Sequence, residues 1–154
     1  MAAFVVRHAK AGDRDQWEGD DRLRPLSKDG MKQAEGLVKT LEAEPIDAIL
    51  SSGYVRCRQS VEPLARDRKL PIETTPDLEE GAGGDRLLQL IARFKRRNAV
   101  FCTHGDVVEE LLEILIGKGI VPRKEARLEK GSTWILEERD GAVTAARYLP
   151  APSS

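Results

Sequence analysis

Two histidines occupy matching positions in the sequence. His8 follows an apolar run at residues 4–6, and His104 follows a second apolar run at residues 100–103. Each histidine stands where the chain is expected to leave a β-strand. In open α/β sheets, ligands bind in the crevice at the carboxyl ends of the strands. We therefore expect the two imidazoles to meet in one crevice.

Cationic side chains are expected at the same crevice. Arg7 directly precedes the first histidine, and Arg56 follows a third apolar segment through a Ser-Ser-Gly turn. Planar guanidinium groups match the oxygens of a phosphoryl group. Gly105 permits close backbone approach where the next helix begins, and a helix N-terminus favours anions. The sequence therefore predicts a site for a phosphate ester or a phosphoramidate.

The elements that position these residues alternate between short apolar runs and helical patterns, which is typical of an α/β domain. Ser27 is the predicted N-cap of the first helix, and Pro63 is expected to kink or restart the second. We expect a three-layer sandwich with a mostly parallel central sheet, flanked by helices, and a C-terminal hairpin. The predicted strands are 3–6, 48–50, 72–74 (edge-like) and 99–103, the predicted helices 31–41, 55–69, 87–94 and 107–116, and the hairpin 132–137 with 142–149.

Composition indicates one folded domain. The chain has 154 residues, 40% of them hydrophobic, and 25 Lys and Arg against 26 Asp and Glu, a net charge of −1. We assign residues 1–150 to a single domain and residues 151–154 to a frayed tail. The balanced charge argues against nucleic-acid and membrane-surface partners. Two isolated cysteines, no membrane-spanning run and no export signal lead us to expect a cytoplasmic protein.

Three segments resemble motifs of the histidine phosphatase superfamily, also called the phosphoglycerate mutase-like family. Arg-His-Ala at 7–9 is similar to the family's Arg-His-Gly signature, and Ser-Ser-Gly-Tyr-Val-Arg-Cys-Arg-Gln-Ser at 51–60 to its Ser-x-x-x-x-Arg-Ala-x-Gln-Thr stretch. Thr-His-Gly at 103–105 resembles its second histidine motif. Ala9 stands in place of the family's glycine, a small change if its φ is negative and a serious one if its φ is positive.

The short length and the Arg-Pro-Leu-Ser-x-x-Gly pattern at 24–30 resemble the SixA-like branch of small phosphohistidine phosphatases. Residues 7–12, 19–22 and 61–65, together with Trp17, more closely resemble the phosphatase-like domain fused behind a MutT-type Nudix domain in actinobacteria. The chain contains no Nudix box. We expect a stand-alone version or an isolated domain, with a possible functional link to a Nudix hydrolase.

The resemblance implies a role for each central residue. His8 is the nucleophile, and its neutral imidazole becomes phosphohistidine, which water then hydrolyses. Arg7, Arg56 and His104 hold the phosphoryl oxygens, and a protonated His104 serves this role best. This set of residues implies no metal and no cofactor.

The proton donor and the outer substrate contacts are less sharply defined. Register with the family's acidic segment indicates Glu80 as the acid, with Glu79 and Asp77 as substitutes. An alkoxide leaving group needs such an acid, whereas phosphohistidine does not. Lys10 and Arg24 are candidate substrate contacts in the loop that follows the nucleophile.

These observations favour a metal-independent phosphatase whose substrate is a phosphohistidine protein or a small phosphorylated compound. Two alternatives stay open. One is a phosphosugar mutase, although such enzymes usually have extra segments that enclose the substrate. The other is a phosphate-binding or partner-binding module with little turnover, a reading kept open by Ala9 and by the undefined acid.

Overall fold

Six strands form one mixed sheet in the order β3-β2-β4-β1-β5-β6 in a computed structural model that describes residues 1–153. β3, β2, β4 and β1 pair in parallel, whereas β5 is antiparallel to β1 and to β6. The strands are β1 (Ala2–Arg7), β2 (Ala48–Ser51), β3 (Ile72–Thr74), β4 (Ala99–Thr103), β5 (Thr133–Arg139) and β6 (Ala142–Leu149). The predicted mostly parallel sheet with a C-terminal hairpin is confirmed, and β3 lies at an edge as expected.

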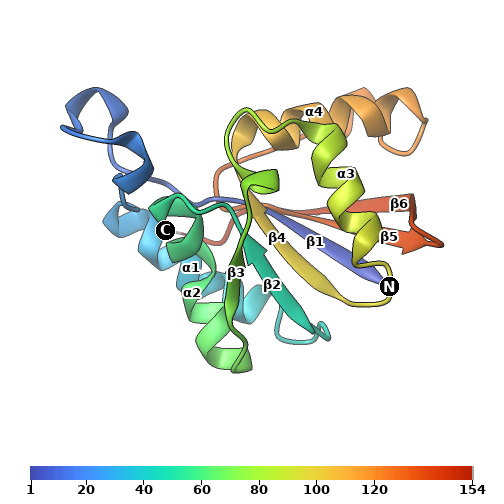
Figure 1. The fold of residues 1–154 in the computed structure, drawn as a ribbon, viewed down its shortest axis with the longest axis horizontal. Coiled ribbons are helices and arrows are strands. Elements are labelled where there is room, and N and C mark those ends of the chain that lie inside the picture. Colours follow the sequence, from blue (N-terminus) through green and yellow to red (C-terminus); the bar gives the residue numbers. More distant parts are fainter. Residues whose placement is uncertain (154) are drawn as a thin grey trace.

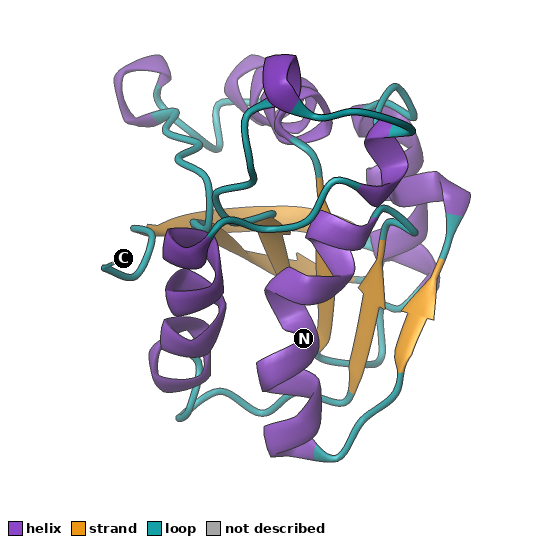
Figure 2. Ribbon diagram, turned by 90° about the vertical axis from the view of Figure 1, so that its left-hand side faces the viewer, coloured by secondary structure: helices purple, strands orange, loops and turns teal. Residues whose placement is uncertain are grey.

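Helices cover both faces of this sheet, as Figures 1 and 2 show. The alternation of β1 explains how: Phe4 and Val6 pack in the cluster that contains Leu37 of α1, while Val5 packs in the cluster that contains Leu87 of α3. The four helices are α1 (Lys28–Thr40), α2 (Val55–Arg68), α3 (Gly84–Arg93) and α4 (Gly105–Gly117). The three-layer sandwich is therefore confirmed.

The helix boundaries show where local sequence signals are strong. Ser27 caps α1 as predicted, since its Oγ accepts a hydrogen bond from the backbone N–H of Gly30 at 3.1 Å. The expected restart at Pro63 is wrong, because α2 is assigned as one helix through this residue. Val61 and Leu64 on either side of the proline are fully buried, and this packing holds the helix together.

The longest segment between a strand and the α-helix that follows it comes after β1, at residues 8–27. Figure 1 shows the segment between β1 and α1 projecting from the body of the molecule. Two short 3-10 helices, η1 (Arg14–Gln16) and η2 (Asp21–Leu23), order this segment. Asp13 and Asp20 cap them, with side-chain oxygens that accept backbone N–H groups two residues ahead at 2.9 Å.

The C-terminal hairpin turns at Asp140 and Gly141, which both have positive φ, 54° and 87°. Such a pair is typical of the tight turns that match the twist of a hairpin. Past β6, Pro152 lies against Gly36 of α1, where a Cβ would come within 2.5 Å of the proline ring. The domain limit at residue 150 and the frayed tail stay predictions, and residue 154 lies outside the described residues. Over residues 1–153, none of the helices combines the length and the apolar character needed to cross a membrane.

Candidate active site

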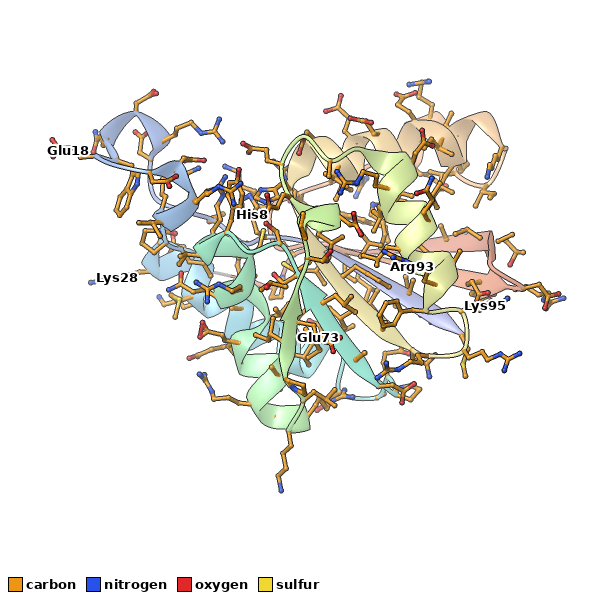
Figure 3. The ribbon with its side chains drawn as sticks, viewed as in Figure 1. His8, Glu18, Lys28, Glu73, Arg93 and Lys95 are labelled. Carbon is orange, nitrogen blue, oxygen red and sulfur yellow. The ribbon has the colours of Figure 1, made fainter. Side chains whose placement is uncertain are left out.

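The two histidines meet at the carboxyl edge of the sheet. His8 directly follows β1 and His104 directly follows β4, and the two strands pair with Arg7 opposite Thr103. The ring centroids lie 5.5 Å apart with the ring planes at 69°. Figure 3 shows His8 at this edge and Glu18 far from it, at the tip of the projecting segment. The structure therefore builds one crevice from two strand ends that are about a hundred residues apart in the chain.

His8 is held as a neutral ring with one nitrogen committed. Its Nδ1 lies 2.8 Å from the carbonyl oxygen of Ala9, a group that only accepts hydrogen bonds, so Nδ1 carries the hydrogen. Burial lowers the pKa of His8 from its ordinary value of 6.5 to about 3, and the nearby His104 and Arg56 act in the same direction. The Nε2 lone pair is consequently available at neutral pH.

Ala9 fits its position without backbone strain. Among the described residues, the non-glycine positions with positive φ are Lys69 and Asp140, so Ala9 has the ordinary sign. Its backbone N–H donates to Ser60 Oγ at 2.9 Å, and the Ser60 hydroxyl donates to the carbonyl oxygen of Arg56 at 2.7 Å. The residue that departs from the family glycine thus ties the nucleophile to α2.

Three buried nitrogen atoms mark the centre of the crevice. Arg7 Nε, Arg56 Nε and His104 Nδ1 have no hydrogen-bond partner within residues 1–153, and Thr133 Oγ1 is the one other buried polar side-chain atom there in this condition. Buried polar groups are nearly always paired, so an unpaired set from three different elements indicates a ligand. Donors from two arginines and one histidine suit an anion with several oxygens, such as a phosphoryl group.

His104 is oriented by its second nitrogen. Nε2 lies 2.9 Å from Ser52 Oγ, which already accepts the backbone N–H of Tyr54 at 3.2 Å. When the Ser52 hydroxyl donates to Nε2, the hydrogen of a neutral His104 lies on Nδ1, and a protonated ring carries a hydrogen on both nitrogens and donates from Nε2 to Ser52 Oγ. The edge of the Tyr54 ring, with its centroid 4.6 Å from that of His104, fixes the imidazole plane.

Arg56 is fully buried and is aimed by an aspartate of the projecting segment. Its Nη1 donates to the carbonyl oxygen of Asp21 at 2.9 Å and its Nη2 to Asp21 Oδ2 at 3.0 Å. Burial raises the pKa of Asp21, but hydrogen bonds and charge from Arg24 and Arg56 outweigh that effect and leave the pKa below its usual value. The sequence analysis missed Asp21, because a loop rich in both charges resembles an ordinary solvated surface.

Of the three candidate acids, the structure brings one to the crevice. Glu80 Oε1 lies 3.4 Å from Arg56 Nη2 and 3.9 Å from His104 Nδ1. Glu79 instead pairs with Arg22 at 3.0 Å. Asp77 accepts hydrogen bonds from two arginines of α3, Arg86 and Arg93, outside the crevice. Glu80 is therefore the carboxylate positioned to exchange a proton with a group held at the histidines.

Gly105 serves Arg7 as well as the pocket. A Cβ on Gly105 would lie 2.5 Å from Arg7 Nη2 and 2.8 Å from Arg7 Nε, so the guanidinium lies flat against the glycine. Arg7 Nη1 also donates to the carbonyl oxygen of Leu128. Burial lowers the pKa of Arg7, and the carboxylates of Glu109 and Asp106 oppose this effect. The sequence suggested that the glycine lets backbone approach the ligand, but its main close contact is the arginine.

The two candidate substrate contacts, Arg24 and Lys10, line different hollows. The crevice opens into a pocket of about 780 Å³, which Arg24 lines, with its Nε donating to Asp21 Oδ1 at 2.9 Å. Lys10 lines a separate hollow beside Gln33. Lys130 lines both, and the sequence analysis missed it because it lies in an irregular segment before β5. The pocket is lined by Arg7, His8, Ala11, Gly12, Asp13, Arg14, Arg24, Glu80, Gly105, Asp106, Glu109, Leu128 and Lys130.

Two cysteines lie near the site among the described residues. Cys57 and Cys102 are free and buried. Cys57 Sγ lies 3.5 Å from His104 Nε2, on the side of the ring away from Glu80. Within the part of the chain that the structure describes, no group of three or more His, Cys, Asp or Glu side chains is arranged to hold a metal ion.

Comparison with known proteins gives consistent matches. The histidine phosphatase superfamily (branch 1) matches residues 3–86. An 8-oxo-(d)GTP phosphatase of Mycolicibacterium smegmatis is 40% identical over 97% of this chain, and the chain spans about half (48%) of that relative's length. SixA from Agrobacterium tumefaciens has a TM-score of 0.77 with 25% identity, covering 97% of both chains. The structure of the protein histidine phosphatase SixA complexed with tungstate has a TM-score of 0.76 with 17% identity, covering 99% of this chain and 97% of that one.

Proposed function

The chain belongs to the histidine phosphatase superfamily, and on that basis we propose that it is a metal-independent phosphatase that acts through a phosphohistidine at His8. The observation that carries this proposal is the state of the His8 ring. The Nδ1 hydrogen bond to Ala9 and the pKa of about 3 leave Nε2 unprotonated at neutral pH. An imidazolium has no lone pair to offer, so a neutral ring is the first requirement of a histidine nucleophile.

In the first step, His8 Nε2 forms a bond to phosphorus while the bond from phosphorus to the leaving group breaks in line. Negative charge on the equatorial oxygens is stabilised by the unpaired nitrogens of Arg7, Arg56 and His104. The two arginines supply positive charge of the kind that a metal supplies in other phosphatases. Glu80 in its protonated form gives its proton to an alkoxide leaving group, and a better leaving group departs without it.

In the second step, water attacks the phosphohistidine, the bond between phosphorus and His8 Nε2 breaks, and inorganic phosphate forms. Glu80, now a carboxylate, accepts the proton of the attacking water. Its position 3.9 Å from His104 Nδ1 and 3.4 Å from Arg56 Nη2 supports both roles, since these atoms belong to two of the side chains that hold the phosphoryl group in this proposal. The same arrangement therefore serves transfer and hydrolysis.

The substrate in this proposal is a phosphohistidine protein or a small phosphorylated compound. The 25% identity to SixA supports the first, and the relative named 8-oxo-(d)GTP phosphatase supports the second. From the resemblance of residues 7–12, 19–22 and 61–65 to the domain fused behind MutT-type Nudix domains, we also propose a functional link to a Nudix hydrolase. Two buried free thiols agree with a reducing compartment, and we propose a cytoplasmic location.

The test measures phosphate release in EDTA from a phosphohistidine-bearing protein and from a nucleoside phosphate, with wild type and His8→Ala. We expect release by wild type and a loss of at least about a thousandfold in the variant, because the nucleophile is gone. Acid-labile phosphate trapped on wild type by rapid quenching is the matching covalent readout. Turnover by His8→Ala at the wild-type rate would overturn the proposed nucleophile. Phosphate binding without turnover in wild type would instead support a binding module.

A further inference from the structure

The backbone around Lys130 is fixed directly beside the nucleophile. Lys130 lies in the segment between η4 (Arg123–Glu125) and β5. The N–H of Gly131 lies 3.1 Å from the carbonyl oxygens of both Arg7 and His8, and the Lys130 carbonyl accepts from Gln33 Nε2 at 3.2 Å. Gly131 has a φ of +87°, a backbone conformation that residues other than glycine rarely adopt. The position from which the Lys130 side chain starts is therefore set by the end of β1.

Lys130 is an exposed cation, and residues 1–153 supply no counterion for it. Its ammonium group makes no hydrogen bond or ion pair with the described residues, although it lines the same pocket as His8. Burial lowers the pKa of Lys130, and the like charges of Arg7, Arg24, Arg14 and Arg56 lower it further. A cation among cations is unfavourable by itself, and an anion bound between them relieves the repulsion.

The carboxylates of the pocket lie elsewhere. Asp106 and Glu109 belong to the first turns of α4, and Asp106 Oδ2 accepts the backbone N–H of Gly81 at 2.8 Å. Asp13 is engaged in capping η1. Glu80 lies near His104 Nδ1 and Arg56 Nη2. The pocket thus combines carboxylates of α4 with the cations Arg24 and Lys130, and the charges that act most strongly on Lys130 are those of arginines.

We propose that Lys130 binds a second anionic group of the substrate, next to the phosphoryl group that is transferred to His8. The substrate class is then a small molecule with two neighbouring phosphates, such as a nucleoside diphosphate. A protein phosphohistidine carries no second phosphate and gains nothing from this lysine. Lys130 also lines the adjoining hollow of about 420 Å³ with Lys10 and Gln33, which gives space to the rest of such a molecule. This inference rests on the proposed function and deepens it.

The test compares the binding of inorganic phosphate and inorganic pyrophosphate by isothermal titration calorimetry. We expect wild type to bind pyrophosphate at least about tenfold more tightly than phosphate, since one added charge-assisted contact is worth about a factor of ten. Lys130→Gln should remove that advantage and leave phosphate binding within about twofold. Lys130→Arg keeps the charge and should restore the advantage. Lys28→Gln is the matched control, because Lys28 points outward from the body of the molecule, below the projecting segment in Figure 3.

The outcomes separate this inference from the proposed function. Equal weakening of both anions by Lys130→Gln, or no weakening of pyrophosphate, overturns the second anion subsite. Tight pyrophosphate binding that depends on Lys130, without turnover of any phosphate, overturns the proposed activity and leaves the subsite standing. A wild type that binds neither anion overturns both.

Discussion

The protonation state of His8 leads to a quantitative prediction about stability. Burial lowers the pKa of this histidine from 6.5 to about 3, so the folded protein excludes a proton that the unfolded chain binds. Between these two values the unfolded state carries more protons, and stability must fall as the pH falls below 6.5. The contribution is fully present above pH 6.5 and is lost progressively toward pH 3.

The magnitude follows from the two pKa values. At pH 5 an unfolded histidine of pKa 6.5 is stabilised by protonation by about 2 kcal/mol, whereas a folded one of pKa about 3 gains almost nothing. His8→Ala removes this term. Lowering the pH from 8 to 5 should therefore cost wild type about 2 kcal/mol more unfolding free energy than it costs His8→Ala. The effect of the lost side-chain volume is the same at both pH values and cancels in the double difference.

Urea denaturation of the two proteins at pH 8 and pH 5, followed by circular dichroism, measures this difference. NMR titration of the histidine ring signals gives an independent readout, and it is simple to assign because the chain contains two histidines. The His8 ring signals, assigned by their loss in His8→Ala, should stay at their neutral positions down to pH 5. A double difference below about 0.5 kcal/mol, or a His8 midpoint near 6.5, would refute the reasoning from burial.

Three further predictions concern residues that position the site. Gly105→Ala should lower kcat on an aryl phosphate about a hundredfold with little change in Tm, because the new Cβ would lie 2.5 Å from the Arg7 guanidinium; wild-type kinetics would show that Arg7 does not need this position. Asp21→Asn should lower kcat about tenfold with the fold retained by circular dichroism, since Arg56 loses the carboxylate that aims it at 3.0 Å; an unchanged kcat would mean that the Asp21 carbonyl suffices. Glu80→Gln should lower turnover of an alkyl phosphate and spare an aryl phosphate, and an equal loss on both would contradict a leaving-group acid.

Most of the sheet and the meeting of the histidines could be predicted from sequence because both depend on local signals. The apolar run at 99–103 and the Ser27 cap correspond to β4 and to the start of α1. The starts of α3 and α4 lie before their first apolar residues, because the opening turns hold glycine and charged residues with no helical periodicity. A pattern of apolar spacing cannot show such turns.

Charge pairs between distant segments could not be predicted in the same way. Asp21 contacts Arg56 across 35 positions, and Lys130 reaches the pocket only because Gly131 is bonded to the end of β1. Neither Asp21 nor Lys130 belongs to a hydrophobic repeat or to a motif of fixed spacing that would identify it in the sequence. The sequence analysis named Lys10 and Arg24 of the charged loop as candidate contacts but not Asp21, whose carboxylate holds the buried Arg56 in the structure.

The unpaired nitrogens explain why Arg7 and Arg56 need neighbouring residues that hold them in place. Each buried donor without a partner costs a fold about 1–3 kcal/mol, and Arg7, Arg56 and His104 each contribute one such nitrogen. If Arg7 and Arg56 were free to rotate, they would find other acceptors and the set would collapse. Arg7 is held by its Nη1 hydrogen bond to the Leu128 carbonyl and by its flat contact with Gly105, and Arg56 is held by its two hydrogen bonds to Asp21. The residues that aim the arginines therefore matter to catalysis as much as those that touch the phosphoryl group, since preorganised charge is what stabilises the transition state.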